Sequence, residues 1–132
     1  MMISVDQAVR LRAAGVVWAP RAGDRFVVLN RDMDCDVFLI SEMVVEVHDL
    51  PTGRMLRFNG TTEWALDSIE EHDAVWLPRE DQLRDLLGDC FVRLEAIPGG
   101  MVAVVMSSGQ THRCIDVDAE RAYARAVLAL IG

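Results

Sequence analysis

Alternating apolar and polar residues predict most of the regular structure of this chain as strands. Residues Met43–His48 place Met43, Val45 and Val47 on one face, which is typical of a half-buried strand. A turn at Leu50–Gly53 then predicts a hairpin with Arg54–Phe58. Further strands are expected at Arg25–Leu29, Val37–Ile40, Phe91–Ile97, Met101–Met106 and Thr111–Ile115, and Val75–Leu77 should run extended between the two middle helices.

Helical periodicity and capping residues predict four helices. Ser4 and Gln7 form a capping-box pattern for a helix over Val5–Ala14, which Gly15 would end. Asp116 or Asp118 would cap a C-terminal helix with one long apolar stripe. That stripe consists of Ala119, Ala122, Tyr123, Ala126, Val127, Leu130 and Ile131. Two short middle helices are expected at Glu63–Ile69 and, led by Pro78, at Arg79–Leu87.

The order of these elements indicates an α+β fold. Consecutive strands are joined by tight turns, so they should pair antiparallel. We expect a mostly antiparallel sheet of about six to seven strands, with an N-terminal helix, two short middle helices and a C-terminal helix. The 132 residues, 52% of them apolar, are enough for a single domain over residues 1–132 with its own core.

The charge balance argues against several classes of function. Twenty-one acidic and 13 basic residues give a formal net charge of −8, which opposes binding to a phosphate backbone, so no nucleic-acid partner is expected. All 13 bases are arginine. Without lysine there is no P-loop lysine and no amine for a Schiff base, which excludes ordinary P-loop ATPases, protein kinases and pyridoxal enzymes.

Neither a metal nor another cofactor is expected. Asp32–Asp36 has the spacing that begins a calcium loop, but Val37 and Met43 stand where glycine and glutamate are needed. His112 and Cys114 share one face of a strand, yet a structural zinc site needs four ligands. Cysteine-nucleophile catalysis stays formally open without local support.

The cysteine count and the N-terminal sequence suggest a cytoplasmic protein without a membrane partner. The three cysteines are an odd number without a CxxC pair, which is typical of a reducing compartment. The N-terminal residues do not have the pattern of a signal peptide. The longest apolar runs, Met101–Met106 and Ala126–Ile131, are too short to span a bilayer.

Tryptophan provides the strongest indication of a binding surface. Trp64 lies off the apolar stripe of its expected helix, and Asp67 and Ser68 follow it at helical spacing. Trp76 lies between two acidic clusters, Glu70–Asp73 and Glu80–Asp85. We take Trp64, Asp67, Ser68 and Trp76 as candidate binding residues, against the alternative that the three tryptophans are core and the acids only solubilise the chain. No catalytic residue is assigned.

Residues 74–131 resemble small uncharacterised phage and prophage proteins. The resemblance rests on Trp76–Pro78, on Gln82–Phe91 and on the closing helix Ala119–Leu130. It implies a proline-led helix, two or three strands and a final alanine-rich helix. The full length is similar to short actinobacterial proteins, some labelled pilus assembly proteins, through the segments GDRFVV, FNGTTEWALDS and WLPREDQLRDLLG. The namesake of that label is a ParA-like localisation ATPase, whose lysine this chain lacks.

These observations favour a non-enzymatic accessory protein that binds a protein partner or forms a homo-oligomer such as a dimer. An exposed sheet face or the patch around Trp64 would provide the contact surface. One alternative is a small hydrolase or ligand-binding domain with a pocket between the sheet and the middle helices, where Asp67, His72 or Asp73 would converge. Another is an acidic protein of the immunity or antitoxin type that neutralises a basic partner.

Overall fold

The computed structural model describes residues 2–29, 37–40, 44–50, 53–59, 68–70 and 73–132. The chain forms two compact units, each described by itself below. The terminal unit combines Met1–Val17 with Pro78–Gly132, and the middle unit is Trp18–Leu77. The expectation of a single domain over residues 1–132 stays a prediction.

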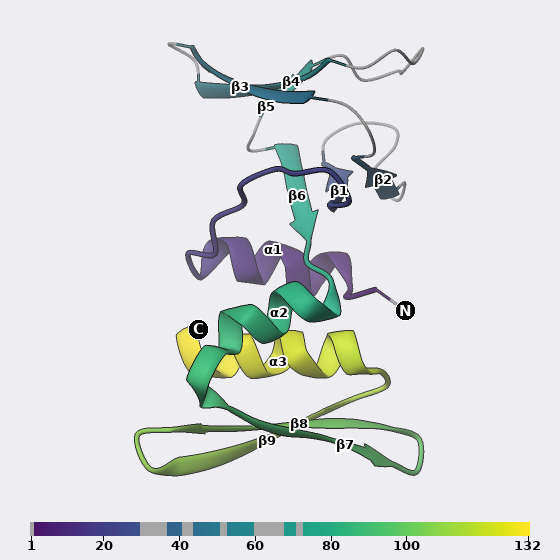
Figure 1. Cartoon of the computed structure of the whole chain (residues 1–132), viewed down its shortest axis with the longest axis vertical. Helices are drawn as coiled ribbons and strands as arrows, with labels where there is room; N and C mark the ends of the chain where they lie inside the picture. The colour runs from purple at the N-terminus through teal and green to yellow at the C-terminus, as the bar shows by residue number, and fades with distance from the viewer. Residues whose placement is uncertain (1, 30–36, 41–43, 51–52, 60–67, 71–72) are drawn as a thin grey trace. The chain divides into compact units, whose positions relative to one another are not determined.

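The described elements confirm an α+β fold (Figure 1). They are α1 (Val5–Ala13), β1 (Arg25–Val28), β2 (Val37–Leu39), β3 (Val44–Leu50), β4 (Gly53–Asn59), β5 (Ser68–Glu70), β6 (Ala74–Leu77), α2 (Glu80–Leu87), the 3-10 turn η2 (Gly88–Cys90), β7 (Phe91–Ile97), β8 (Gly100–Ser107), β9 (Gln110–Asp116) and α3 (Ala119–Ile131).

The strand count and the single sheet predicted from the sequence were wrong. Nine described strands form three separate antiparallel sheets, in the orders β2-β1-β6, β3-β4-β5 and β7-β8-β9. The third sheet belongs to the terminal unit, and its tight turns join strands that are neighbours in the sequence. Among the described strands, β7, β8 and β9 pair with no strand of the other two sheets.

One of the two middle helices was also predicted wrongly. The last two residues of the expected helix Glu63–Ile69 lie in strand β5 instead. There Ser68 pairs with Arg57 of β4, and Ile69 pairs with Leu56 of β4. The rest of that helix lies outside the described residues. The free edge of β4 supplies backbone partners, so pairing overrides the local helical pattern. The other middle helix is confirmed as α2, and the predicted hairpin is confirmed as β3 and β4.

The first sheet of the middle unit carries aromatic residues across all three strands. Phe26 of β1 pairs in register with Phe38 of β2 and with Trp76 of β6, so the three side chains share one face. The rings of Phe26 and Phe38 stack at 5.5 Å between centroids, and the Trp18 ring lies 5.6 Å from Phe26. This face therefore forms the aromatic part of the sheet's core.

A buried carboxylate ties the entry of the chain to this sheet. Asp24 is 2% exposed, and its Oδ2 accepts hydrogen bonds from Trp18 Nε1 at 2.9 Å and from the Arg21 amide at 3.1 Å. The Asp24 carbonyl also accepts from the Ile40 amide at 2.9 Å. A buried charge is stable only when it is bonded in this way, so Asp24 fixes Trp18 over the sheet.

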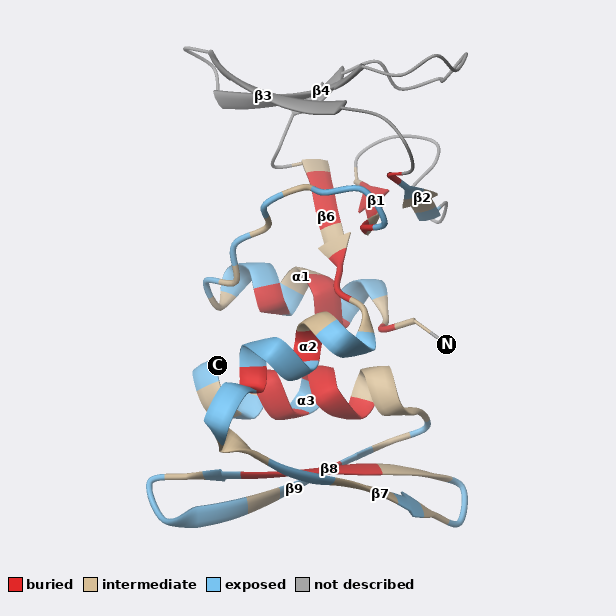
Figure 2. Ribbon diagram, viewed as in Figure 1, coloured by how far each residue is buried: buried red, intermediate tan, exposed pale blue. Residues whose placement is uncertain are grey.

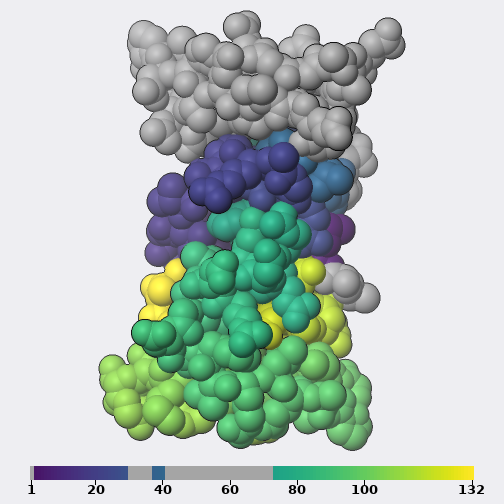
Figure 3. All heavy atoms as spheres, viewed as in Figure 1, coloured from purple at the N-terminus to yellow at the C-terminus, as the bar shows by residue number. Residues whose placement is uncertain are grey.

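Helix α3 occupies the centre of the terminal unit. The third sheet packs against one side of it, and α1 and α2 lie on other sides (Figure 1). Its fully buried residues include Ala122, Ala124 and Ala126 (Figure 2). Ala122 and Ala124 point about 200° apart on a helix, so α3 is covered over more than half its circumference. In the space-filling view, yellow α3 atoms are visible on both sides of the teal α2 atoms that lie in front of the helix (Figure 3).

The helix ends follow the capping rules that the sequence predicts. Ser4 and Gln7 form both bonds of the capping box on α1, and Gly15 follows that helix with a φ of +104°. Asp118 caps α3, since its Oδ1 accepts from the Arg121 amide at 2.9 Å. Gly88 ends α2 with a φ of +55°. None of the helices described here is long and apolar enough to cross a membrane.

Substituting each tryptophan of the first sheet by phenylalanine should separate the roles of the two indole groups. Trp18→Phe leaves the buried Asp24 without one donor and should lower the free energy of unfolding by about 1–3 kcal/mol. Trp76→Phe is the matched control, because Trp76 Nε1 is buried without a hydrogen-bond partner among the described residues. Urea denaturation measures both, and an equal or larger loss for Trp76→Phe would contradict this account.

Candidate functional site

The predicted binding patch around Trp64 falls largely outside the described residues. Trp64 and Asp67 both lie there, and Ser68 is the first residue of β5. Trp76 lies in β6 and is half-buried, with its Nε1 unbonded within the described part of the chain. The grouping of these four residues into one binding patch therefore stays a prediction.

The cysteine and histidine pair on β9 does not extend into a larger cluster of ligands. His112 and Cys114 share a face of the strand, as expected from their spacing. Across residues 2–29, 37–40 and 73–132, no three His, Cys, Asp or Glu side chains lie close enough to hold a metal ion. Burial raises the pKa of the Cys114 thiol, which disfavours the thiolate needed for nucleophilic attack. The acidic segment Asp32–Asp36 lies outside the described residues.

The terminal unit contains a polar cavity that the sequence analysis did not anticipate. Its volume is about 290 Å³, and we call it the arginine pocket. It is lined by residues at the start of α1, at the end of β9 and along α3: Ser4, Asp6, Gln7, Arg10, Asp116, Arg121, Arg125 and Leu128. Helical spacing places them together, because Arg121, Arg125 and Leu128 follow each other at i, i+4 and i+7.

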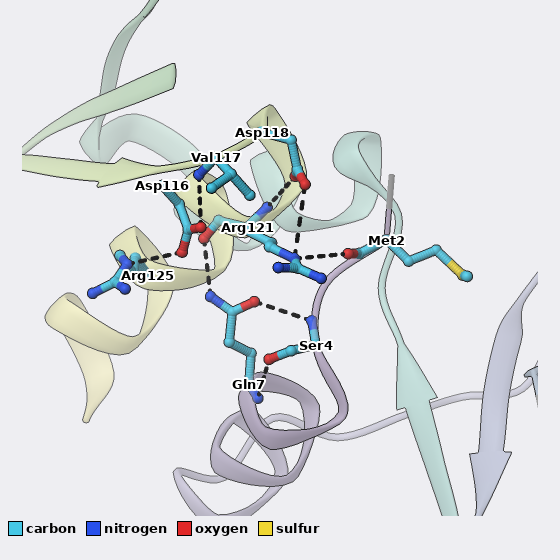
Figure 4. A network of polar contacts seen from close by, with 8 residues as sticks. All are labelled: Met2, Ser4, Gln7, Asp116, Val117, Asp118, Arg121 and Arg125. Atoms are coloured by element: carbon cyan, nitrogen blue, oxygen red, sulfur yellow. Dashed lines mark hydrogen bonds and ion pairs between the residues drawn. The ribbon is translucent and has the colours of Figure 1, made fainter. Parts of the chain in front are cut away.

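Gln7 joins α1 to α3 at the wall of the arginine pocket (Figure 4). Its side chain is nearly buried, and both ends of the amide are bonded. Oε1 accepts from the Ser4 amide at 3.2 Å, and Nε2 donates to the Arg121 carbonyl at 3.2 Å. Since a buried amide is costly to leave unbonded, Gln7 fixes the spacing of the two helices.

Arg121 makes a second connection between the same helices (Figure 4). Its Nε donates to the Met2 carbonyl at 3.2 Å and lies 3.7 Å from Asp118 Oδ2. Residues before α1 are thereby attached to the first turn of α3. The Arg121 side chain is about one-third exposed and lines the pocket.

Asp116 holds Arg125, the second arginine of α3, in place. Its Oδ2 accepts from Arg125 Nε at 2.9 Å, and its Oδ1 accepts from the Val117 amide at 2.7 Å (Figure 4). Burial acts to raise the pKa of the Asp116 carboxyl, but these hydrogen bonds and the nearby positive charges outweigh it and lower the pKa. Asp116 is therefore ionised at neutral pH and pairs with Arg125.

The spacing of charged residues on α1 and α3 gave an indication of the arginine pocket that the hydrophobic pattern did not. The predictions from the sequence used the apolar stripe of α3 and not its polar side, where Arg121 and Arg125 lie one turn apart. Asp6 and Arg10 have the same spacing on α1 and form an ion pair of 3.3 Å. Whether these two polar stripes lie next to each other depends on how α1 packs against α3. The spacing of residues along each helix does not specify that packing.

Comparison with known proteins adds no family to this description. No family model, curated protein or solved structure matches the chain.

Replacing Asp116 by asparagine should remove a pH-dependent part of the stability. A lowered carboxyl pKa stabilises the fold above the unfolded value near 3.8, and the stabilisation is lost as the pH falls through the lower folded value. Asp116→Asn should therefore cost about 1 kcal/mol at pH 7, and the difference from wild type should shrink below pH 3.8.

Urea denaturation across this pH range measures the effect, with Asp6→Asn at an exposed ion pair as the control. A constant difference between wild type and Asp116→Asn from pH 7 to pH 2 would contradict the assignment.

Proposed function

We propose that the protein is a non-enzymatic module that self-associates through the free edge of β9. This edge carries the proposal because it is regular and unprotected. All seven residues of β9 pair with β8 without a bulge, and the sheet order leaves the other side of β9 unpaired among the described strands. Such an edge can accept another strand through its backbone groups.

The opposite edge of the same sheet is protected. The register of β7 shifts between Phe91 and Arg93, and such a bulge disturbs the ladder of backbone groups. Strand β9 has no bulge, proline or lysine, and its central charge is neutralised, since Arg113 Nη2 lies 3.3 Å from Glu95 Oε2. The difference favours β9 over β7 as the contact edge.

The side chains beside this edge suit a contact with a second copy. One face of the third sheet carries Met106 of β8 and Ile115 of β9 as exposed apolar side chains, while Val102 and Val104 on the same face are already fully buried. Ile115 is 52% exposed and Met106 is 48% exposed. Two β9 edges that meet antiparallel would extend the sheet to double its width and bring both Ile115 side chains toward the shared edge.

A second copy explains these features more simply than a different partner. Identical edges satisfy each other's backbone groups about a twofold axis, so no further sequence is required. The ion pairs of Glu95 with Arg93 and Arg113 keep the adjacent face close to neutral, which limits repulsion between copies of a chain with a net charge of −8. No comparable observation among the described residues supports the acidic immunity-type role or a function implied by the phage or pilus-assembly resemblance.

The oligomeric state and one pair of matched variants test this proposal. Light scattering after size exclusion should give twice the monomer mass of 14.7 kDa at high protein concentration. Ile115→Lys should shift the chain to monomer, because it loses about 2 kcal/mol of apolar burial per copy and adds like charges at the edge.

Ile131→Lys is the control, since Ile131 is 48% exposed at the end of α3 and outside the third sheet. It should leave the dimer unchanged. A monomer at every concentration for the wild type, or equal dissociation in both variants, would refute self-association through β9.

A further inference from the structure

We propose that the arginine pocket is a binding site for a small oxyanion, a phosphate or carboxylate group. This inference is independent of self-association through β9. Three guanidinium groups, from Arg10, Arg121 and Arg125, line one cavity of about 290 Å³. That volume is at the lower end of ligand pockets, so it suits a small group better than an extended ligand.

Each of the three arginines is held through its own Nε atom. Arg10 Nε lies 3.3 Å from Asp6, Arg121 Nε donates to the Met2 carbonyl at 3.2 Å, and Arg125 Nε donates to Asp116 at 2.9 Å. In each of these contacts the bonding atom is Nε and not one of the terminal Nη groups. A guanidinium that is anchored through Nε keeps its two Nη groups free for paired hydrogen bonds to an oxyanion.

This anchoring lowers the entropic cost of binding. A free arginine side chain loses considerable rotamer freedom when it is fixed on a ligand. Here Asp116 and the Met2 carbonyl hold Arg125 and Arg121 before a ligand arrives, whereas the ion pair of Arg10 with Asp6 is exposed to solvent. Gln7 and Arg121 fix α1 against α3, so the two walls of the pocket are also set in advance.

The charge of the lining selects an anion over a cation. Three arginines and two aspartates line the pocket, a formal charge of +1 on a chain whose net charge is −8, and Asp118 lies beside the lining at 3.7 Å from Arg121 Nε. Both carboxylates already accept hydrogen bonds or ion pairs from arginine Nε, and these contacts do not involve the Nη donors. A cation would meet the positive groups, so the unused chemistry of the pocket is that of a donor for oxyanions.

Binding of inorganic phosphate to the full chain tests the site. Calorimetric titration and thermal denaturation compare phosphate with chloride at equal ionic strength, and acetate serves as a separate carboxylate arm. Phosphate or acetate should bind and stabilise the wild type beyond the effect of chloride. The anion that binds more tightly, phosphate or acetate, shows whether the site prefers a phosphate or a carboxylate group.

Matched arginine variants separate the pocket from general charge effects. Arg10→Gln and Arg125→Gln should each weaken oxyanion binding by about tenfold, because each removes a pair of charged donors. Arg12→Gln makes the same charge change at an exposed position of α1 outside the pocket lining and should leave binding unchanged. The Arg10 side chain is 67% exposed, so that variant keeps the test valid if Arg125→Gln fails to fold.

Two results would overturn the proposal. One is stabilisation by phosphate and acetate that does not exceed that by chloride. The other is an equal loss of binding in Arg12→Gln and in the pocket variants, which would show attraction by overall charge alone.

Discussion

The terminal unit depends on the burial of α3 on several sides at once. Its alanines allow the third sheet, α1 and α2 to approach closely, and Tyr123 packs against Phe91 of β7 at 5.7 Å between ring centroids. Arg84 of α2 lies 4.4 Å over the same Phe91 ring. Because these contacts meet on one helix, the position of α3 determines where the sheet and the other helices can lie.

Both proposed surfaces follow from that position. One face of the third sheet packs against α3, and the outer edge of β9, unpaired among the described strands, is the edge proposed for a second copy. The polar side of α3 carries Arg121 and Arg125, and its contact with α1 through Gln7 closes the arginine pocket. Asp116, at the end of β9, contributes to the pocket wall and so connects the sheet with the α3 arginines.

Local patterns predicted the elements of the terminal unit well, since caps and alternation are encoded within a few residues. The capping box at Ser4 and Gln7, the helix after Pro78 and the strands after Cys90 are confirmed. The division into three sheets was missed because strand pairing across the chain depends on tertiary contacts. The arginine pocket was missed for the same reason, and the predicted patch at Trp64 lies outside the described residues.

Amide hydrogen exchange tests the central position of α3 most directly. Amides of residues 122–127 should exchange as slowly as those of the central strand β8, because both are buried from two sides. The more exposed amides of α2 should exchange faster. Rapid exchange in α3 while β8 stays protected would contradict an account in which this helix holds the terminal unit together.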